Sequence, residues 1–157
     1  MATFNKFQIF VQDVGRKVHD LNADTLKIML TNTAPNTADT HFDTVVGPPA
    51  VIEATSNAAE ITAQFGYAAG GATVPATRSF TQTAGVGKLL GGDVVFTAAG
   101  GSIGPFRYAV LYNATGGAGA TRPVIGWWDY GSALTLLDTE TLTVDLDQAA
   151  GILTIGT

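Results

Sequence analysis

The stretch "GGSIG" at residues 100–104 has the G-x-S-x-G spacing of a hydrolase nucleophile, in which a sharp turn exposes the serine. In that motif a helix follows the serine, and an aspartate and then a histidine come later in the chain. Here the residues after Ser102 include a proline and read as a strand, and both histidines, His19 and His41, precede the serine. We therefore interpret Ser102 as part of a glycine turn between strands and predict that the protein is not an enzyme.

The segment "ADTHFDT" places Asp39, His41 and Asp43 at alternate positions, so an extended chain would turn all three side chains the same way. One histidine with two loop aspartates is a poor ligand set for zinc. A loosely held calcium ion is the alternative to a solvated loop, which we take as the default. The glycine-rich stretches lack the lysine and hydroxyl residue that end a phosphate-binding P-loop. The sequence therefore predicts no metal site and no cofactor.

The stretch "RPVIGWWDYGSALTL" at residues 122–136 sets two tryptophans beside an aspartate and a tyrosine. In a strand, Trp128 and Tyr130 point to one face, and Trp127 and Asp129 point to the other. Rings that diverge make a poor platform for stacking a sugar. We expect one tryptophan in the core and the other at a partner surface, because tryptophan is enriched at interface hot spots. A wholly buried pair and a ligand-stacking site are the alternatives.

Arg107 is the other residue that stands out, since it lies within the apolar stretch "GPFRYAVLYN". In a strand the alternation gives two faces: Phe106, Tyr108, Val110 and Tyr112 on one, and Arg107, Ala109, Leu111 and Asn113 on the other. A lone arginine on an apolar face needs a carboxylate or water. We expect Asp129 on a neighbouring strand to pair with it, with Asp145 or Asp147 as alternatives, in a structural or inter-subunit ion pair.

The elements that must position these residues are mostly strands. Runs rich in threonine, valine and aromatic residues, cut by glycine turns, predict strands at 24–33, 73–83, 86–90, 93–98, 105–113, 122–130, 133–137, 141–147 and 151–156. A three–four spacing favours one short helix at about residues 4–14. The sequence thus predicts a mainly β fold, an antiparallel β-sandwich or jelly-roll-like barrel. We interpret residues 1–157 as a single domain, with an N-terminal segment (1–23), an extended loop or arm (34–71) and a main β core (72–157).

The charge pattern limits the classes of partner. The net charge is −5, and the eight basic residues are scattered, so a nucleic-acid partner is not expected. No apolar run reaches the roughly 18 residues needed to span a bilayer, and the first residues lack the pattern of a signal peptide. We therefore expect a soluble protein that binds no membrane. Only 13% of the residues are charged, which favours a subunit whose surface neighbours cover.

Five stretches resemble, in the same order, those of a group of tailed-bacteriophage virion proteins: "DTLKIMLTNTAP", "GYAAGG", "GGSIGPFRYAVLYN", "RPVIGWWDYGSALTL" and "TLTVDLDQAAGILTI". The resemblance implies a small β-rich virion component made in the host bacterial cytoplasm. Within that class, a capsid decoration or cement protein is the member that this chain most resembles. Such proteins bind the outside of the major capsid protein lattice, often as dimers or trimers. The resemblance supplies no catalytic residues.

The leading hypothesis is therefore a non-enzymatic capsid decoration protein that stabilises the head, with the major capsid protein and further copies of itself as partners. A tail or head–tail subunit (tube, collar or fibre) is the structural alternative. A carbohydrate-binding β-sandwich module that uses Trp127, Trp128 or Tyr130 is the alternative from another class. The candidate partner-binding residues are Trp127, Trp128, Tyr130, Arg107, Phe42, Val51 and Ile52.

Overall fold

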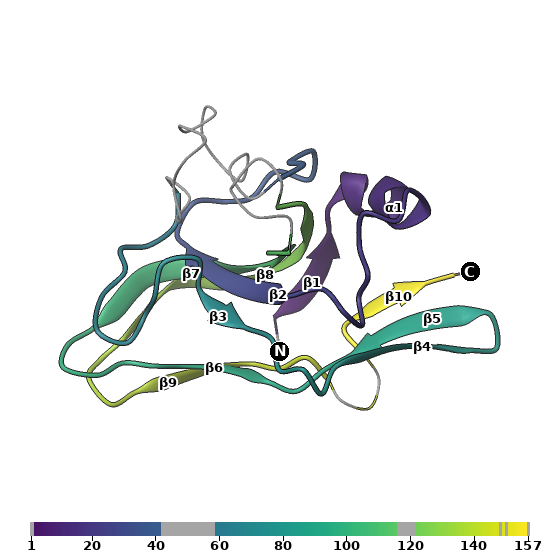
Figure 1. Cartoon of the computed structure of the whole chain (residues 1–157). Helices are drawn as coiled ribbons and strands as arrows, with labels where there is room; N and C mark the ends of the chain where they lie inside the picture. The colour runs from purple at the N-terminus through teal and green to yellow at the C-terminus, as the bar shows by residue number, and fades with distance from the viewer. Residues whose placement is uncertain (1, 42–58, 116–121, 148, 150, 157) are drawn as a thin grey trace.

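The computed structural model describes residues 2–41, 59–115, 122–147, 149 and 151–156. Strands dominate these residues, and one short helix lies near the N-terminus (Figure 1). In chain order the elements are β1 (Thr3–Lys6), α1 (Gln8–Gly15), β2 (Leu26–Thr31), β3 (Ala72–Thr73), β4 (Ser79–Thr83), β5 (Val86–Leu90), β6 (Val94–Thr97), β7 (Ile103–Asn113), β8 (Val124–Leu136), β9 (Thr141–Val144) and β10 (Leu153–Ile155). The predicted mainly β fold with one short helix is confirmed.

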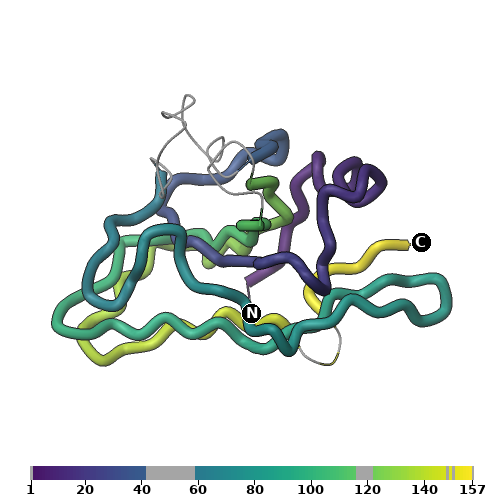
Figure 2. Tube along the Cα trace, in the orientation of Figure 1, coloured from purple at the N-terminus to yellow at the C-terminus, as the bar shows by residue number. Residues whose placement is uncertain are grey.

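The strands form two layers. The upper layer in Figure 1 is a five-stranded antiparallel sheet in the order β1-β8-β7-β2-β3. The lower layer holds a three-stranded sheet, β10-β5-β4, and a two-stranded sheet, β6-β9. Because residues 91–93 join β5 to β6 and residues 145–152 join β9 to β10, these two sheets follow one another along a ribbon beneath the upper sheet (Figures 1 and 2). The arrangement is that of an antiparallel β-sandwich.

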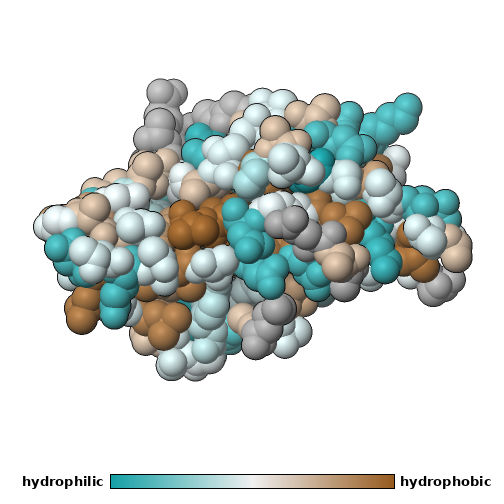
Figure 3. Space-filling model, turned by 90° about the horizontal axis from the view of Figure 1, so that it is seen from below, coloured by the Kyte–Doolittle hydropathy of each residue, from teal (hydrophilic) through white to brown (hydrophobic). Residues whose placement is uncertain are grey.

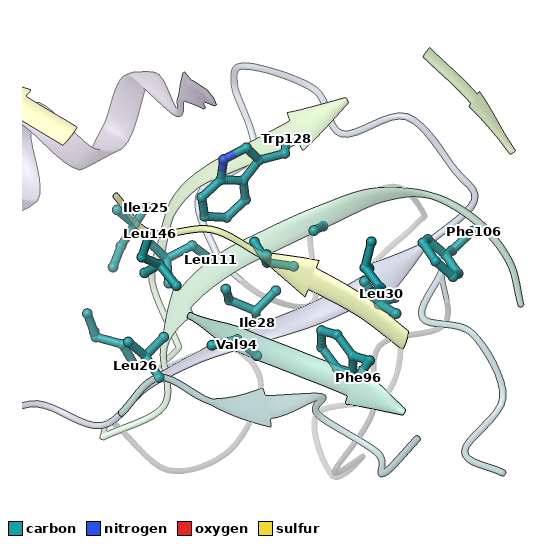
Figure 4. Close-up of a cluster of buried hydrophobic side chains, with 14 of the residues drawn as sticks. Leu26, Ile28, Leu30, Val94, Phe96, Phe106, Leu111, Ile125, Trp128 and Leu146 are labelled. Carbon is teal, nitrogen blue, oxygen red and sulfur yellow. The ribbon is translucent and has the colours of Figure 1, made fainter. Parts of the chain in front are cut away.

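The main hydrophobic core lies between the layers (Figure 4). Strand alternation explains it, since Val94 and Phe96 of β6 are buried while Val95 between them is half exposed. The upper sheet supplies the other side of this core. Its buried contributors include Leu26, Ile28, Leu30, Phe106, Ala109, Leu111, Ile125 and Trp128.

A second cluster, which we call the outer cluster, lies on the opposite face of the upper sheet, and its buried members are Phe7, Met29, Tyr108, Val110, Tyr112, Val124 and Trp127. The central strands β7 and β8 are therefore covered on both faces. A strand that is buried on both faces needs apolar residues at every position rather than at alternate ones. This explains the unbroken apolar stretches "YAVLY" and "VIGWW".

The N-terminal helix begins later than the spacing predicted. Residues 4–6, which the sequence placed in the helix, belong instead to β1, which pairs with β8, with Thr3 opposite Asp129 and Lys6 opposite Gly126. This pairing closes the edge of β8. The ring of Phe4 also occupies the space where Gly126 has no side chain, since a Cβ at Gly126 would lie 2.2 Å from that ring. Long-range pairing thus outweighs the local helical spacing.

The predicted arm is docked at both of its described ends. The Gln8 N–H donates to the Thr37 carbonyl at 3.0 Å, and the Ile61 N–H donates to the Leu30 carbonyl at 3.1 Å. Residues 42–58, which include the candidates Phe42, Val51 and Ile52, lie outside the described residues. An arm that reaches a partner therefore stays a prediction.

Two strand boundaries also differ from the prediction. The predicted strand 73–83 is divided into β3 and β4, and the segments 122–130 and 133–137 form the single strand β8.

Candidate functional site

The two tryptophans lie on opposite faces of β8, as strand alternation predicted, but both are buried. Trp127 is 8% exposed in the outer cluster, and Trp128 is 4% exposed in the main core. Both tryptophans are buried because Phe4 of β1 and Phe7, which follows β1, cover them. The sequence did not predict β1. The Phe7 ring lies 4.5 Å from Trp127 and the Phe4 ring lies 4.8 Å from Trp128, so each tryptophan has its own aromatic cover. The expectation of one tryptophan at the surface is therefore wrong for this chain, and no tryptophan platform is exposed for a sugar.

Arg107 and Asp129 form the expected ion pair. Arg107 Nε donates to Asp129 Oδ1 at 2.7 Å and Arg107 Nη2 donates to Oδ2 at 2.9 Å, while the Gly131 N–H donates to Oδ1 at 2.7 Å. The hydrogen bonds from Arg107 and Gly131 hold the pKa of Asp129 below its usual value, and the bonds to Asp129 raise the pKa of Arg107. Both side chains remain about one-third exposed, at 37% and 34%. The pair thus neutralises itself at the surface.

An irregularity in β8 creates this site. Phe106 is opposite Leu134 and Tyr108 is opposite Asp129, so β8 has extra residues between its two paired positions. Gly131, with φ of 83°, lies in this bulge. The bulge also breaks the predicted alternation, because Phe106 belongs to the main core whereas Tyr108 belongs to the outer cluster. The prediction that these two residues share a face is wrong.

Tyr130 is half-buried beside the ion pair. Its ring lies edge-on to Phe106 with centroids 6.5 Å apart, and burial raises the pKa of its phenol to about 12. Asp129, Tyr130 and Gly131 line an open hollow of about 480 Å³ together with Ala2 and Thr3. This hollow holds an aspartate that three donors already satisfy. It can therefore take part in a contact, with its carboxylate already held by Arg107 and Gly131.

A polar cluster that the sequence did not predict lies between α1 and the upper sheet. The His19 side chain is fully buried, with its Nε2 atom 4.0 Å from Asp13 Oδ2. Burial lowers the pKa of His19, although Asp13 and Asp24 act in the opposite direction. Asn113 Nδ2 donates to Asp24 Oδ2 at 2.5 Å. His19 and Asn113 are 94 residues apart, so no local spacing could have indicated that they meet.

The remaining candidates for chemistry have structural roles where they are described. Ser102 is exposed and leads directly into β7, so no helix follows it as the hydrolase motif requires. Asp39 Oδ2 accepts the Asn36 N–H at 2.8 Å within a tight turn, and His41 forms an isolated bridge with Pro123. Asp43 lies outside the described residues. Within the described ranges, no three histidine, aspartate or glutamate side chains are placed to share a metal ion.

The outer surface of the β6–β9 ribbon is uncharged. Val95 pairs with Thr143, and Thr97 pairs with Thr141. All four side chains are exposed on the side away from the core, Val95 by 52%, and we call these four residues the Thr/Val face. In Figure 3, which shows the molecule from below, brown and pale residues lie among teal ones at the left-hand end that holds these strands. Leu137, in the turn that leads into β9, is 61% exposed.

Comparisons with family models, with curated proteins and with solved structures find no match for this chain. The resemblance to phage virion proteins therefore remains a prediction that rests on the quoted stretches. Among the described residues, no helix has the length and apolar character to cross a membrane.

Proposed function

We propose that the protein is a non-enzymatic structural subunit of a tailed-phage particle, a capsid decoration protein that binds the outside of the major capsid lattice. The observation that carries this proposal is the Thr/Val face, together with the exposed Leu137 at its end. The cores of protein–protein interfaces are depleted of charged residues, as this surface is. Its side chains stand on paired strands, so little conformational entropy is lost when a partner covers them.

The composition supports the same proposal. Only 13% of the residues are charged, about half of what is usual for a free globular protein. A decoration protein is bound beside many neighbours on a lattice, so individually weak contacts add up through high local concentration. A chain with few charges and an exposed, uncharged Thr/Val face suits this kind of binding. Self-association into a dimer or trimer belongs to the proposal, and the net charge of −5 gives no reason to add a nucleic-acid partner.

Particle reconstruction and immunogold labelling with an antibody against the purified protein test the proposal. Label over the head at hundreds of copies per particle is the expected result. Label confined to the tail, at a few to a few tens of copies, would contradict the decoration role and favour the tail or head–tail alternative. Absence from purified particles would contradict every virion role.

A further inference from the structure

We propose that the outer edge of β9 binds an extended segment of a partner protein as an added antiparallel strand, and that this segment carries basic residues at its ends. The inference rests on the proposed function, because it names the binding mode by which such a subunit would hold a neighbouring virion protein. Strand addition to a free sheet edge supplies affinity through main-chain hydrogen bonds.

The register of the β6–β9 pair determines which backbone groups of β9 are free. The Ala98 N–H donates to the Glu140 carbonyl at 2.9 Å. Hydrogen-bonded pairs recur at every second residue of an antiparallel ladder, so Leu142 and Val144 bond to β6. Thr141 and Thr143 therefore direct their N–H and carbonyl groups away from β6. Neither residue has a hydrogen-bond partner on that side among the described residues.

The sequence of β9 contains none of the residues that prevent an edge strand from pairing with another chain. The strand "TLTV" has no charged residue and no proline, and the side chains of Thr141 and Thr143 are exposed. Natural sheets protect exposed edges with charges, prolines, bulges or covering segments, because an unprotected edge recruits other chains. An added strand would lie beside β9 and extend the Thr/Val face.

The other edges of the lower layer are blocked by side chains or by another segment of the backbone. Lys6 Nζ donates to the Thr154 carbonyl on the outer edge of β10 at 3.4 Å. The Phe80 N–H on the outer edge of β4 donates to Asn22 Oδ1 at 2.6 Å. The outer edge of β6 meets residues 65–66, where the Ala99 N–H donates to the Phe65 carbonyl at 2.9 Å.

The edges of the upper sheet are also protected. Where β3 ends, Tyr67 Oη accepts the Leu30 N–H of β2 at 3.0 Å. On the other side, β1 carries the charge of Lys6, and beyond β1 the edge of β8 is interrupted by the bulge at Gly131. Within the described chain, β9 is therefore the edge that is both uncharged and uninterrupted.

The residues that flank β9 determine the chemistry of the partner. Asp138 and Glu140 precede the strand, and Asp145 follows it. If two copies paired through β9 in antiparallel order, Asp138 and Glu140 of each copy would lie beside Asp145 of the other. Like charges across a strand pair are destabilising, so a second copy is disfavoured at this edge. A strand with lysine or arginine at both ends places opposite charges there instead.

Fluorescence anisotropy with a short synthetic peptide of alternating valine and threonine, with two lysines at each end, tests the inference on the full-length protein. We expect binding that weakens with salt, and no binding of the same peptide with glutamates in place of lysines. Thr143→Pro removes one outward N–H and should weaken binding about tenfold or more. Thr154→Pro is the matched control, since it makes the same change on the edge of β10 and should leave binding unchanged.

A second variant covers the case in which Thr143→Pro unfolds the protein. Glu140→Gln with Asp145→Asn removes two charges but keeps the oxygens that accept the Leu137 and Asp147 N–H groups. We expect about threefold to tenfold weaker binding of the basic peptide and a shallower salt dependence. Equal affinity for the acidic and basic peptides, or unchanged binding by either variant, would overturn the inference.

Binding to purified phage heads that lack the protein separates this inference from the proposed function. Heads that bind the wild-type protein but bind Thr143→Pro much less would support both. Heads that bind both proteins equally would overturn the edge inference and leave the decoration role standing. Binding of the peptide without any binding to heads would overturn the decoration role and leave the edge inference standing.

Discussion

The edge of β2 and the edge of β9 differ in whether other residues cover their unpaired backbone groups. Beyond β3, the edge of β2 is sealed by residues 59–71. Tyr67 Oη accepts the Leu30 N–H at 3.0 Å and donates to Glu60 Oε1 at 2.6 Å, and Glu60 Oε1 also accepts the Gly70 N–H at 2.7 Å. The edge of β9 has no comparable cover among the described residues.

The difference indicates what each side of the sandwich is for. Sealing the β2 edge requires a tyrosine and a glutamate to be ordered together, which is an expensive arrangement unless every polar atom is paired. This network lies on the side of the sandwich where β3 approaches β6. The contact between β3 and β6 closes the sandwich there. On the β9 side the described residues form no such network. An open edge on the β9 side is what the proposed strand addition requires.

The largest expected effect comes from breaking the sealed edge at Gly71. A Cβ at this position would lie 1.8 Å from the Ile28 carbonyl oxygen, and the residue has a φ of 71°. Gly71→Ala should therefore lower the free energy of unfolding by about 3 kcal/mol or more, since it combines backbone strain with a clash. Urea denaturation measures the change.

Gly85→Ala is the control for that prediction. Gly85 has a φ of 84°, but nothing lies within 4 Å of the position that its Cβ would take. Its substitution should cost only about 1 kcal/mol, the conformational part of the effect. Equal losses for the two variants would show that the close approach to β2 contributes nothing.

Removing the sealing hydroxyl should have the next largest effect. Tyr67→Phe leaves the Leu30 N–H without an acceptor and takes a donor from Glu60, so we expect a loss of about 1–3 kcal/mol in the free energy of unfolding. Tyr130→Phe is the matched control, because the Tyr130 hydroxyl has no hydrogen bond among the described residues and its loss should cost less than about 0.5 kcal/mol. A similar cost for both would contradict the sealing role.

Alkaline pH should also act on the sealed edge. Burial, followed by the charge of Glu60, raises the pKa of Tyr67, and burial raises the pKa of Tyr112 to about 12. The unfolded chain loses these protons near pH 10, before the folded chain does. Stability is thus fully present below about pH 10 and falls as the pH rises above it.

Unfolding free energies measured between pH 8 and pH 11 test this sign, with the pH values chosen around the tyrosine pKa of about 10. Tyr67→Phe should show a shallower decline with pH than the wild-type protein, since one of the ionising groups is gone. A decline of the same slope in both proteins would assign the alkaline loss to other groups.

The sequence predicted the elements better than it predicted their neighbours. Strand alternation correctly placed Trp127 and Trp128 on opposite faces. The expectation that Arg107 and Asp129 lie on neighbouring strands correctly paired these two residues. It did not predict the burial of both tryptophans, because their covers come from Phe4 and Phe7, more than a hundred residues away. Local patterns carry periodicity, whereas burial depends on which segments meet.

The same limit applies to the edges. Whether β9 is open depends on the strand order, and a sequence pattern gives the order of strands in the chain rather than in the sheet. The sequence could not predict the sealing role of residues 59–71 for the same reason. The segment reads as an irregular loop, yet its Tyr67 hydroxyl substitutes for the strand that β2 lacks beyond β3. An arm formed by residues 34–71 that reaches a partner remains a prediction.

Among the changes to a strand edge, the smallest expected effect on stability comes from unblocking the edge of β4, and this change sharpens the comparison most directly. Asn22→Ala leaves the Phe80 N–H exposed to water, so it should cost less than about 1 kcal/mol. It should also make β4 an open edge without charges in the strand, "SFTQT", and so increase self-association in sedimentation measurements. Asn22→Asp is the control, since its carboxylate still accepts the Phe80 N–H. If Asn22→Ala stays as monodisperse as Asn22→Asp, the side chain of Asn22 is not what protects β4, and the contrast between blocked and open edges loses its physical basis.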